Sequence, residues 1–147
     1  MSSAAETAAA RIASILTVAG VAGGRIYRDR TEAFAAEESP AVVVEISGED
    51  TLHFGGSQQR GSDFGNVDMK EVTFELTYCT RSANWQQDLD ALRVQTHALL
   101  VADEALNDTL QGFHPTSASW DPASAEVPFG ALNQRYTGKT ITQSNQL

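Results

Sequence analysis

The sequence predicts an α+β fold, in which a single mixed, mostly antiparallel sheet of four to five strands is packed by two helices on one face. Two segments with helical spacing of apolar residues each precede a group of strand-like segments, an order typical of α+β domains. A length of 147 residues is enough to bury a substantial core in one domain. We therefore expect residues 1–147 to form one domain.

The first helix is predicted over residues 3–19. Ser2 or Ser3 is placed to cap it, and Glu6 stands where a capping box would follow Ser3. Glycines at 20, 23 and 24 end the pattern. The residues at helical spacing that predict the buried stripe are Ala5, Ala8, Ile12, Ile15 and Leu16.

Three strands are predicted in the next part of the chain. Arg25–Arg28 is a short strand, followed by an acidic segment that forms a helical turn or an ordered loop. Pro40 precedes the run Ala41–Ile46, whose nearly continuous β-branched residues indicate a strand covered on both faces. Met69–Thr80 alternates apolar and polar residues and is about twice the usual strand length, so we expect its ends to project from the domain.

The C-terminal half predicts a second helix and two further strands. The helix begins after the cap Asn84, ends near Ala102 and is followed by a short turn. Residues 113–120 form a strand that Pro115 assigns to a sheet edge. Residues 131–142 form a polar last strand, also expected at an edge, and 143–147 a tail. The core-facing stripe of the helix comprises Trp85, Leu89, Leu92, Thr96 and Leu99.

The segment Ser47–Asp68, between two strong strand patterns, is the least expected feature. Most connections are a handful of residues, and longer ones are usually functional or disordered. This segment is polar and glycine-rich, yet it contains large apolar residues. We expect 48–68 to be an interface loop or a hairpin extension that docks on a partner. The candidate interface residues are Leu52, Phe54, Gly55, Gly56, Arg60 and Phe64 here, with Trp120 and Phe129 on a second surface.

Composition restricts the classes of function. The net charge of -9, from 19 acidic and 10 basic residues, argues against general affinity for DNA phosphates. A single cysteine, Cys79, excludes an internal disulfide framework and suits a reducing cytoplasm. We expect no signal peptide and no membrane span, because the sequence lacks the apolar runs that these need.

The titratable residues do not form a recognisable catalytic pattern. His53, His97 and His114 have no ligand-spaced partner, and Cys79 has no neighbour that would lower its pKa. The glycines near residue 60 lack the lysine and the following helix of a phosphate-binding loop. We therefore predict no catalytic, cofactor-binding or metal-binding residues. The alternative is a small acid–base enzyme that uses sheet carboxylates, namely Glu45, Glu71 and Glu75.

Three stretches carry a family resemblance. They are RIYRDRTEAF with ESPAVVVEI, then VTFELTYCTRS with WQQDLDALRVQTHALLVADEAL, and finally FHPTSASWDPASAEVPFGALNQRYTGKTIT. Their order, from Ala8 to Thr142, resembles that of lambda-like tail terminator proteins of tailed bacteriophages, also called tail completion or minor tail proteins. The long glycine-rich connection and the polarity of the last strand depart from the family's pattern.

The resemblance implies a structural virion protein rather than an enzyme, with no cofactor. It implies a homo-oligomeric ring, a hexamer, at the head-proximal end of the tail tube, which ends tube polymerisation. The implied partners are other copies of the chain, the tail tube protein and a head-side connector or neck protein, with no membrane. Genomic DNA would pass through the ring without specific binding. The protein would be assembled in the host cytoplasm and reside in the virion. The alternative within this class is another neck, or head–tail joining, adaptor protein.

Overall fold

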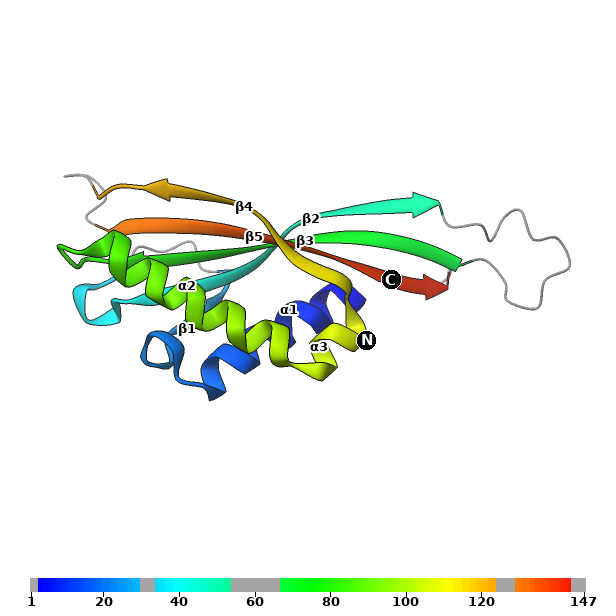
Figure 1. Ribbon diagram of the computed structural model, residues 1–147, viewed down its shortest axis with the longest axis horizontal. Coiled ribbons are helices and arrows are strands. Elements are labelled where there is room, and N and C mark those ends of the chain that lie inside the picture. The colour runs from blue at the N-terminus through cyan, green and yellow to red at the C-terminus, as the bar shows by residue number, and fades with distance from the viewer. Residues whose placement is uncertain (1–2, 30–33, 54–66, 124–128, 144–147) are drawn as a thin grey trace, which may run out of the picture.

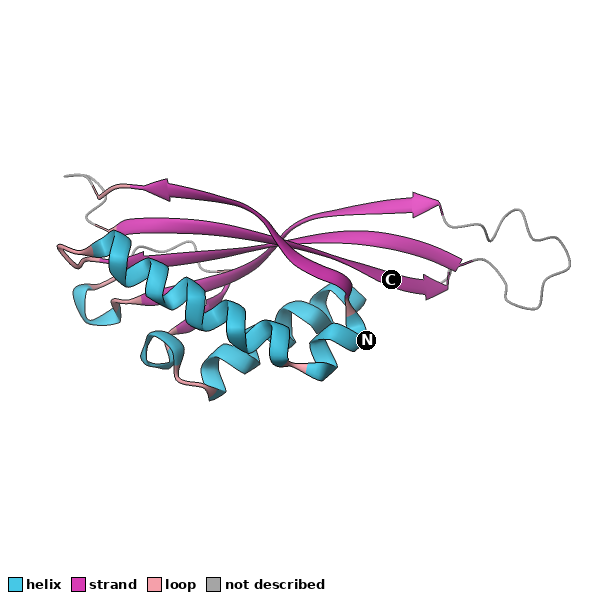
Figure 2. Cartoon of the chain, viewed as in Figure 1, coloured by secondary structure: helices cyan, strands magenta, loops and turns pink. Residues whose placement is uncertain are grey.

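The chain folds as one mixed five-stranded sheet with helices on one face, which confirms the predicted fold class. A computed structural model describes residues 3–29, 34–53, 67–123 and 129–143. The strand order is β1-β2-β3-β5-β4, with β1 parallel to β2 and the other pairs antiparallel. Figures 1 and 2 show the helices gathered on one side of the sheet. The elements are α1 (Ala4–Val18), η1 (Val21–Gly24), β1 (Ile26–Arg28), η2 (Ala36–Glu38), β2 (Ala41–His53), β3 (Val67–Thr80), α2 (Trp85–Ala102), α3 (Glu104–Thr109), β4 (Gln111–Asp121) and β5 (Gly130–Gln143).

The first helix begins as predicted, but Glu6 has a different partner. The Ser3 hydroxyl accepts a hydrogen bond from the Glu6 backbone N–H at 3.1 Å. The Glu6 carboxylate binds both terminal nitrogens of Arg28, at 2.9 and 3.0 Å, and this contact lowers the pKa of Glu6. Arg28 Nε also donates to the Val44 carbonyl at 3.0 Å. Arg28 therefore connects α1 to two strands, and Glu6 is engaged across the fold rather than in a capping box.

The second helix shows one wrong prediction. Asn84 occupies the N-cap position, but its side chain makes no capping hydrogen bond and its backbone is not extended, as a capping residue requires. A side-chain cap occurs instead at α3, where Asp103 Oδ2 accepts from the Leu106 N–H at 2.9 Å. Leu89, Thr96 and Leu100 are the buried residues of α2, so Leu100 lies deeper than the predicted Leu99.

The core lies between the helices and one face of β3. The alternation predicted for this strand is confirmed, because its apolar positions are fully buried and the intervening positions on the opposite face are mostly half-buried. The buried β3 side chains are Val72, Phe74, Leu76 and Tyr78. They belong to one cluster with the stripes of α1 and α2. This period-two pattern therefore decides which face of the sheet receives the helices.

The predicted connection Ser47–Asp68 is too long at both ends. β2 continues to His53 and pairs with β3 as far as Asp68, with one irregularity between Ile46 and Gly48. Beyond Ile46 the strand carries polar residues, so the alternation that reveals a strand in the sequence is lost. Residues 54–66 lie outside the described residues, and so do the predicted interface residues Phe54, Gly55, Gly56, Arg60 and Phe64.

The prediction that the polar last strand lies at a sheet edge is wrong. β5 lies between β3 and β4, and β4 forms the edge, as Pro115 predicted. The interior position tolerates polar residues because they find partners. For example, Gln134 Nε2 donates to the Ser117 carbonyl at 2.9 Å, and Thr77 Oγ1 donates to Asn133 Oδ1 at 2.8 Å.

The sheet projects beyond the helices at one end, where the length of the β3 pattern had predicted projection at both (Figure 1). We call this three-stranded part the tongue and define it as residues 51–53, 67–70 and 140–143. It begins where β4 ends its pairing with β5, at Gln111 opposite Lys139. Within the tongue the strand order is β2-β3-β5, so the two outer strands are β2 and β5.

Substitution of Gly130 by alanine is predicted to destabilise the fold. A Cβ atom at this position would lie 2.5 Å from the Trp85 ring, so the indole must move. We expect the free energy of unfolding in denaturant to fall by about 1–3 kcal/mol. Gly48→Ala is the matched control in another strand, because a Cβ there meets no atom within 4 Å. Equal stability of the two variants would contradict the packing described for Trp85.

Candidate interaction surfaces

The helix-free side of the sheet, which we call the open face, is polar. Residues opposite one another in neighbouring strands share a face, so the register defines rungs that cross the sheet. One rung runs through Glu45, Glu75, Arg135 and Ser117. Another runs through Asp50, Glu71, Lys139 and Gln111. The open face is therefore a charged surface in contact with solvent rather than a second hydrophobic core.

Carboxylates outnumber cations in these two rungs. Four acids, Glu45, Asp50, Glu71 and Glu75, accompany the two bases Arg135 and Lys139. Arg135 Nε lies 3.6 Å from Glu75 Oε2. Further along, Asn133 Nδ2 donates to Asp121 Oδ2 at 2.9 Å. The surface is acidic overall, and its polar groups are partly engaged with one another.

This arrangement weighs against the acid–base enzyme. Glu45, Glu71 and Glu75 are half-buried on the open face and do not converge in an enclosed site. General acid–base catalysis needs a carboxyl group in a partly dry cleft that separates its pKa from that of its neighbour. Glu75 is moreover within reach of the Arg135 guanidinium.

The sheet has two free edges among the described residues. The outer side of β4 faces no further strand. On the other side, β1 pairs only with Val42–Val44, so β2 has no outer neighbour from Glu45 to His53. Unpaired backbone N–H and C=O groups of this kind can accept a strand from another chain. The two edges are different surfaces on opposite sides of the molecule.

A groove of about 400 Å³ lies between α2 and β4. On its floor the Tyr136 hydroxyl lies 3.1 Å from His97 Nδ1, and the Tyr136 ring stacks on Phe113 with the centroids 4.9 Å apart. Burial raises the pKa of Tyr136 to about 12, so the phenol is neutral at physiological pH. The groove can accept apolar side chains. Its lining residues are Arg93, Val94, His97, Ala98, Pro115, Gln134 and Tyr136.

Trp120 and Phe129, the second predicted interface surface, differ in exposure. Trp120 is 36% exposed on β4, and the Arg93 guanidinium carbon lies 5.3 Å from the centroid of a Trp120 ring. Phe129 is only 8% exposed and lies under Arg81, whose guanidinium carbon is 4.5 Å from the ring centroid. Trp120 is therefore available to a partner, whereas Phe129 is covered within its own chain.

Leu52 lies on the tongue and is 38% exposed. The register places Met69 beside it and Ile141 on the far side of Met69, and neither was predicted as an interface residue. Both were missed because their proximity to Leu52 depends on strand pairing between distant parts of the chain. The signal available in the sequence was the apolar character of Ile141 within an otherwise polar strand.

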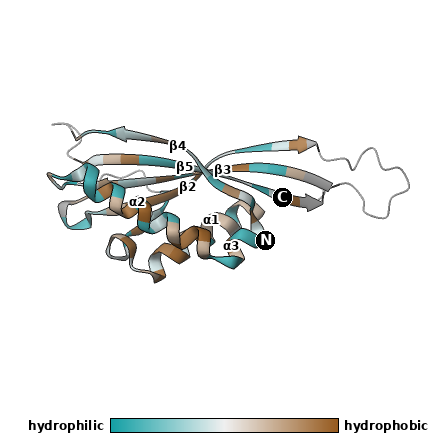
Figure 3. Cartoon of the chain, in the orientation of Figure 1, coloured by the Kyte–Doolittle hydropathy of each residue, from teal (hydrophilic) through white to brown (hydrophobic). Residues whose placement is uncertain are grey.

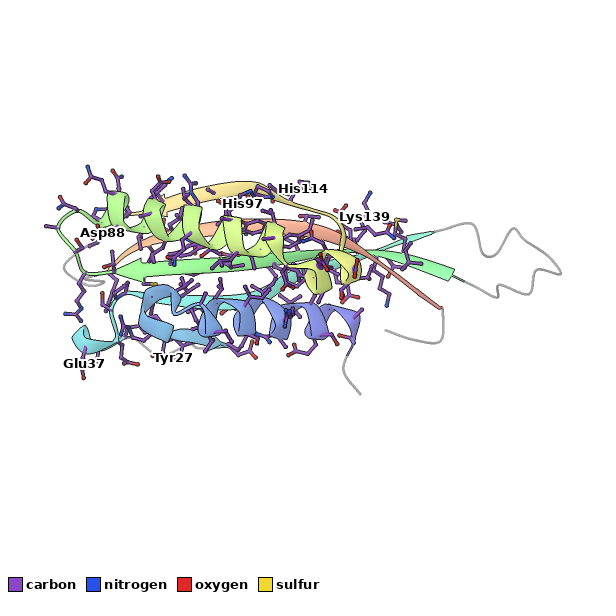
Figure 4. All side chains as sticks on the ribbon, turned by 60° about the horizontal axis from the view of Figure 1, so that its bottom comes forward. Tyr27, Glu37, Asp88, His97, His114 and Lys139 are labelled. Atoms are coloured by element: carbon purple, nitrogen blue, oxygen red, sulfur yellow. The ribbon has the colours of Figure 1, made fainter. Side chains whose placement is uncertain are left out.

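The histidines lie on different elements. His53 is in β2, His97 in α2 and His114 in β4, and Figure 4 shows the last two on separate elements. Within the part of the chain that the structure describes, no three His, Cys, Asp or Glu side chains gather in a way that could hold a metal ion. A membrane-spanning helix is likewise not found among the described helices.

Comparison with known proteins finds similarity only at the level of solved structures. The chain matches no family model and no curated protein. It is similar to a chain in a solved structure described as "Virion of native gene transfer agent (GTA) particle", with 12% sequence identity and a TM-score of 0.34. The match covers 87% of this chain and 84% of that chain. A TM-score this low does not establish a common fold.

Cys79 is predicted to be unreactive in the folded protein. The thiol is buried, and burial raises its pKa from an ordinary value of 9.0 to about 11. The thiolate fraction at pH 8 is then about a hundredfold smaller than for a free cysteine. We expect a chromogenic disulfide reagent to modify the native protein slowly and the guanidinium-unfolded protein rapidly. Rapid modification of the native protein would show that the thiol is accessible.

Proposed function

We propose that this protein is a structural component of a phage virion, which forms a ring at the head-proximal end of the tail tube. There it ends polymerisation of the tube and offers a docking surface to the head-side connector. The observation that best supports this proposal is a sheet with helices on one face, a polar open face and two different free edges. A closed ring requires each copy to present two different surfaces to its neighbours, and the two edges meet this requirement.

The charge of the open face suits the wall of a channel for DNA. With the helices outside, the rungs that contain Glu45 and Glu71 face the axis of the ring. The net charge of -9 has the sign of the DNA phosphates. Like charge disfavours binding, so DNA passes through the ring without being held.

The remaining surfaces supply contacts to other virion proteins. Trp120, partly exposed beside Arg93, is of the residue types that dominate binding energy at protein interfaces. The tongue extends beyond the helices, where it can reach a neighbouring copy or the last ring of tube protein (Figure 1). In this proposal the partners are other copies, six to a ring, the tube protein and the connector.

A neck adaptor that joins head to tail is the second candidate, because it too would form a ring with a channel. The two functions are distinguished by electron microscopy of particles assembled without this protein. Loss of a tail terminator gives overlong tails, because tube polymerisation does not stop. Loss of a neck adaptor leaves tails of normal length detached from heads. Intact, infectious particles without this protein would exclude both functions.

Deletion of Gly55–Gly65 is predicted to spare the fold and impair assembly. The pairing of β2 with β3 from Ala41 to His53 does not involve the deleted residues, so the thermal midpoint should change little. Ring formation or attachment to the tube should be lost if this segment docks on a partner. Solution mass and tail length measure the effect, with deletion of 144–147 as the control. Normal assembly of the Gly55–Gly65 deletion would show that the segment is dispensable.

A further inference from the structure

We propose that Leu52, Met69 and Ile141 form a seam between neighbouring copies, in which Ile141 of one copy packs against Leu52 of the next. The partner is a second copy of this chain, placed head to tail beside the first. This inference rests on the proposed ring and goes beyond it by assigning the residues that join two copies at the tongue.

The three side chains form one apolar rung across the tongue. Leu52 is paired with Met69, and Met69 with Ile141, so all three lie on the same face of the sheet. Leu52 is 38% and Ile141 45% exposed, which is high for large apolar residues. Figure 3 shows hydrophobic residues near the far ends of β2 and β5.

The rung reaches both edges of the tongue. β4 no longer covers β5 beyond Lys139, so Ile141 lies on an outer strand. Leu52 lies on the opposite outer strand, because β1 pairs only with residues 42–44 of β2. A copy placed beside the first, in the same orientation, brings its Leu52 next to Ile141 of the first copy, at the same position along the strands. The row of apolar side chains then continues from copy to copy without a break.

The charges beside the rung favour the same arrangement. On the open face the bases Arg135 and Lys139 lie on β5, whereas Glu45 and Asp50 lie on β2. A head-to-tail neighbour places its acidic β2 edge towards the basic β5 side of the first copy. Among the cations of the open face, Lys139 lies nearest to this seam, two residues from Ile141 on β5, and Figure 4 labels it where β5 leaves the helices. Its complement in the next copy is Asp50. A face-to-face or inverted neighbour would not match acids with bases in this way.

The seam is only one part of the interface. A stable interface buries about 800 Å² on each partner, which is more than three side chains can supply. The free edge of β2 from Glu45 to His53 and that of β4 provide additional area on the same two sides. The apolar rung then determines how two neighbouring copies are aligned along the direction of their strands.

Disulfide cross-linking tests the seam. In a Cys79→Ser background, Leu52→Cys and Ile141→Cys are introduced singly and together, and the purified protein is oxidised during assembly. Because the contact joins two different residues, the double variant should give a ladder of linked copies and each single variant none beyond background. The control pair is Val18→Cys with Ile141→Cys, since Val18 is 85% exposed at the end of α1, on the helix side of the sheet. This pair should give no ladder.

A charge exchange gives an independent readout. Asp50→Lys and Lys139→Asp should each weaken self-association about tenfold, and the double variant should recover it to within about threefold. Thermal midpoints of the isolated chains control for effects on folding. If the double variant associates no better than the two single variants, the head-to-tail register is wrong.

The outcomes separate this inference from the proposed function. Rings that assemble in solution or on tails without a Leu52–Ile141 cross-link would overturn the seam and leave the ring intact. A cross-link from Leu52→Cys to the tube protein, rather than to another copy, would overturn the choice of partner. Protein that never associates, in a phage whose tails are normal without it, would overturn both.

Discussion

Strand β3 is the element on which the rest of the structure depends. It pairs with β5 over its whole length from Val67 to Thr80, and with β2 on the other side from Asp68 to Cys79. Its apolar positions are fully buried, so a shift of one residue would expose the core and bury Glu71 and Glu75. The helices therefore have one possible face to cover. The rungs of the open face and of the tongue follow from the same register.

Salt bridges at the surface link the first helix to the sheet and to α3. Arg28 joins Glu6 to β1 and β2, while Arg11 joins α1 to Asp103 at the start of α3 with a shortest distance of 2.6 Å. The guanidinium contacts lower the pKa of both carboxyl groups. Because these groups are partly exposed, such pairs contribute little stability. Most of the stability comes from the apolar cluster beneath them.

Local periodicity was enough to predict much of the fold. Three local patterns each identify a helix or a strand from a few residues: the capped alanine-rich segment of α1, the apolar stripe of α2 and the alternation of β3. The continuation of β2 through Ser47–His53 could not be predicted in this way, because a projecting strand that is wetted on both faces has no apolar alternation. The interior position of β5 could not be predicted from the sequence either, since strand order is decided by pairing between distant segments. The backbone at Asn84 shows that a favourable residue type does not ensure a cap.

The interface residues, like the fold, could be predicted from sequence only where a local signal marks them. Leu52 and Trp120 were found because large apolar residues stand out in polar sequence, whereas only the register shows that Met69 and Ile141 share a rung with Leu52. Phe129 stands out equally in the sequence, yet it is covered by Arg81. Sequence can therefore nominate interface residues, but only the pairing of strands shows which of them form a continuous surface.

The open face carries both acids and bases, and this mixture meets two opposing requirements of the proposed ring. An acidic channel wall does not hold DNA, but a uniformly acidic sheet would repel an identical neighbour at both edges. In the proposed ring, with the bases on β5 and acids on β2 and β3, the edges of neighbouring copies attract each other while the face keeps an excess of carboxylates. Head-to-tail neighbours match Lys139 with Asp50 and leave Glu71, on the central strand, directed at the channel. For the proposed ring, the placement of these charges across the strands therefore matters more than their number.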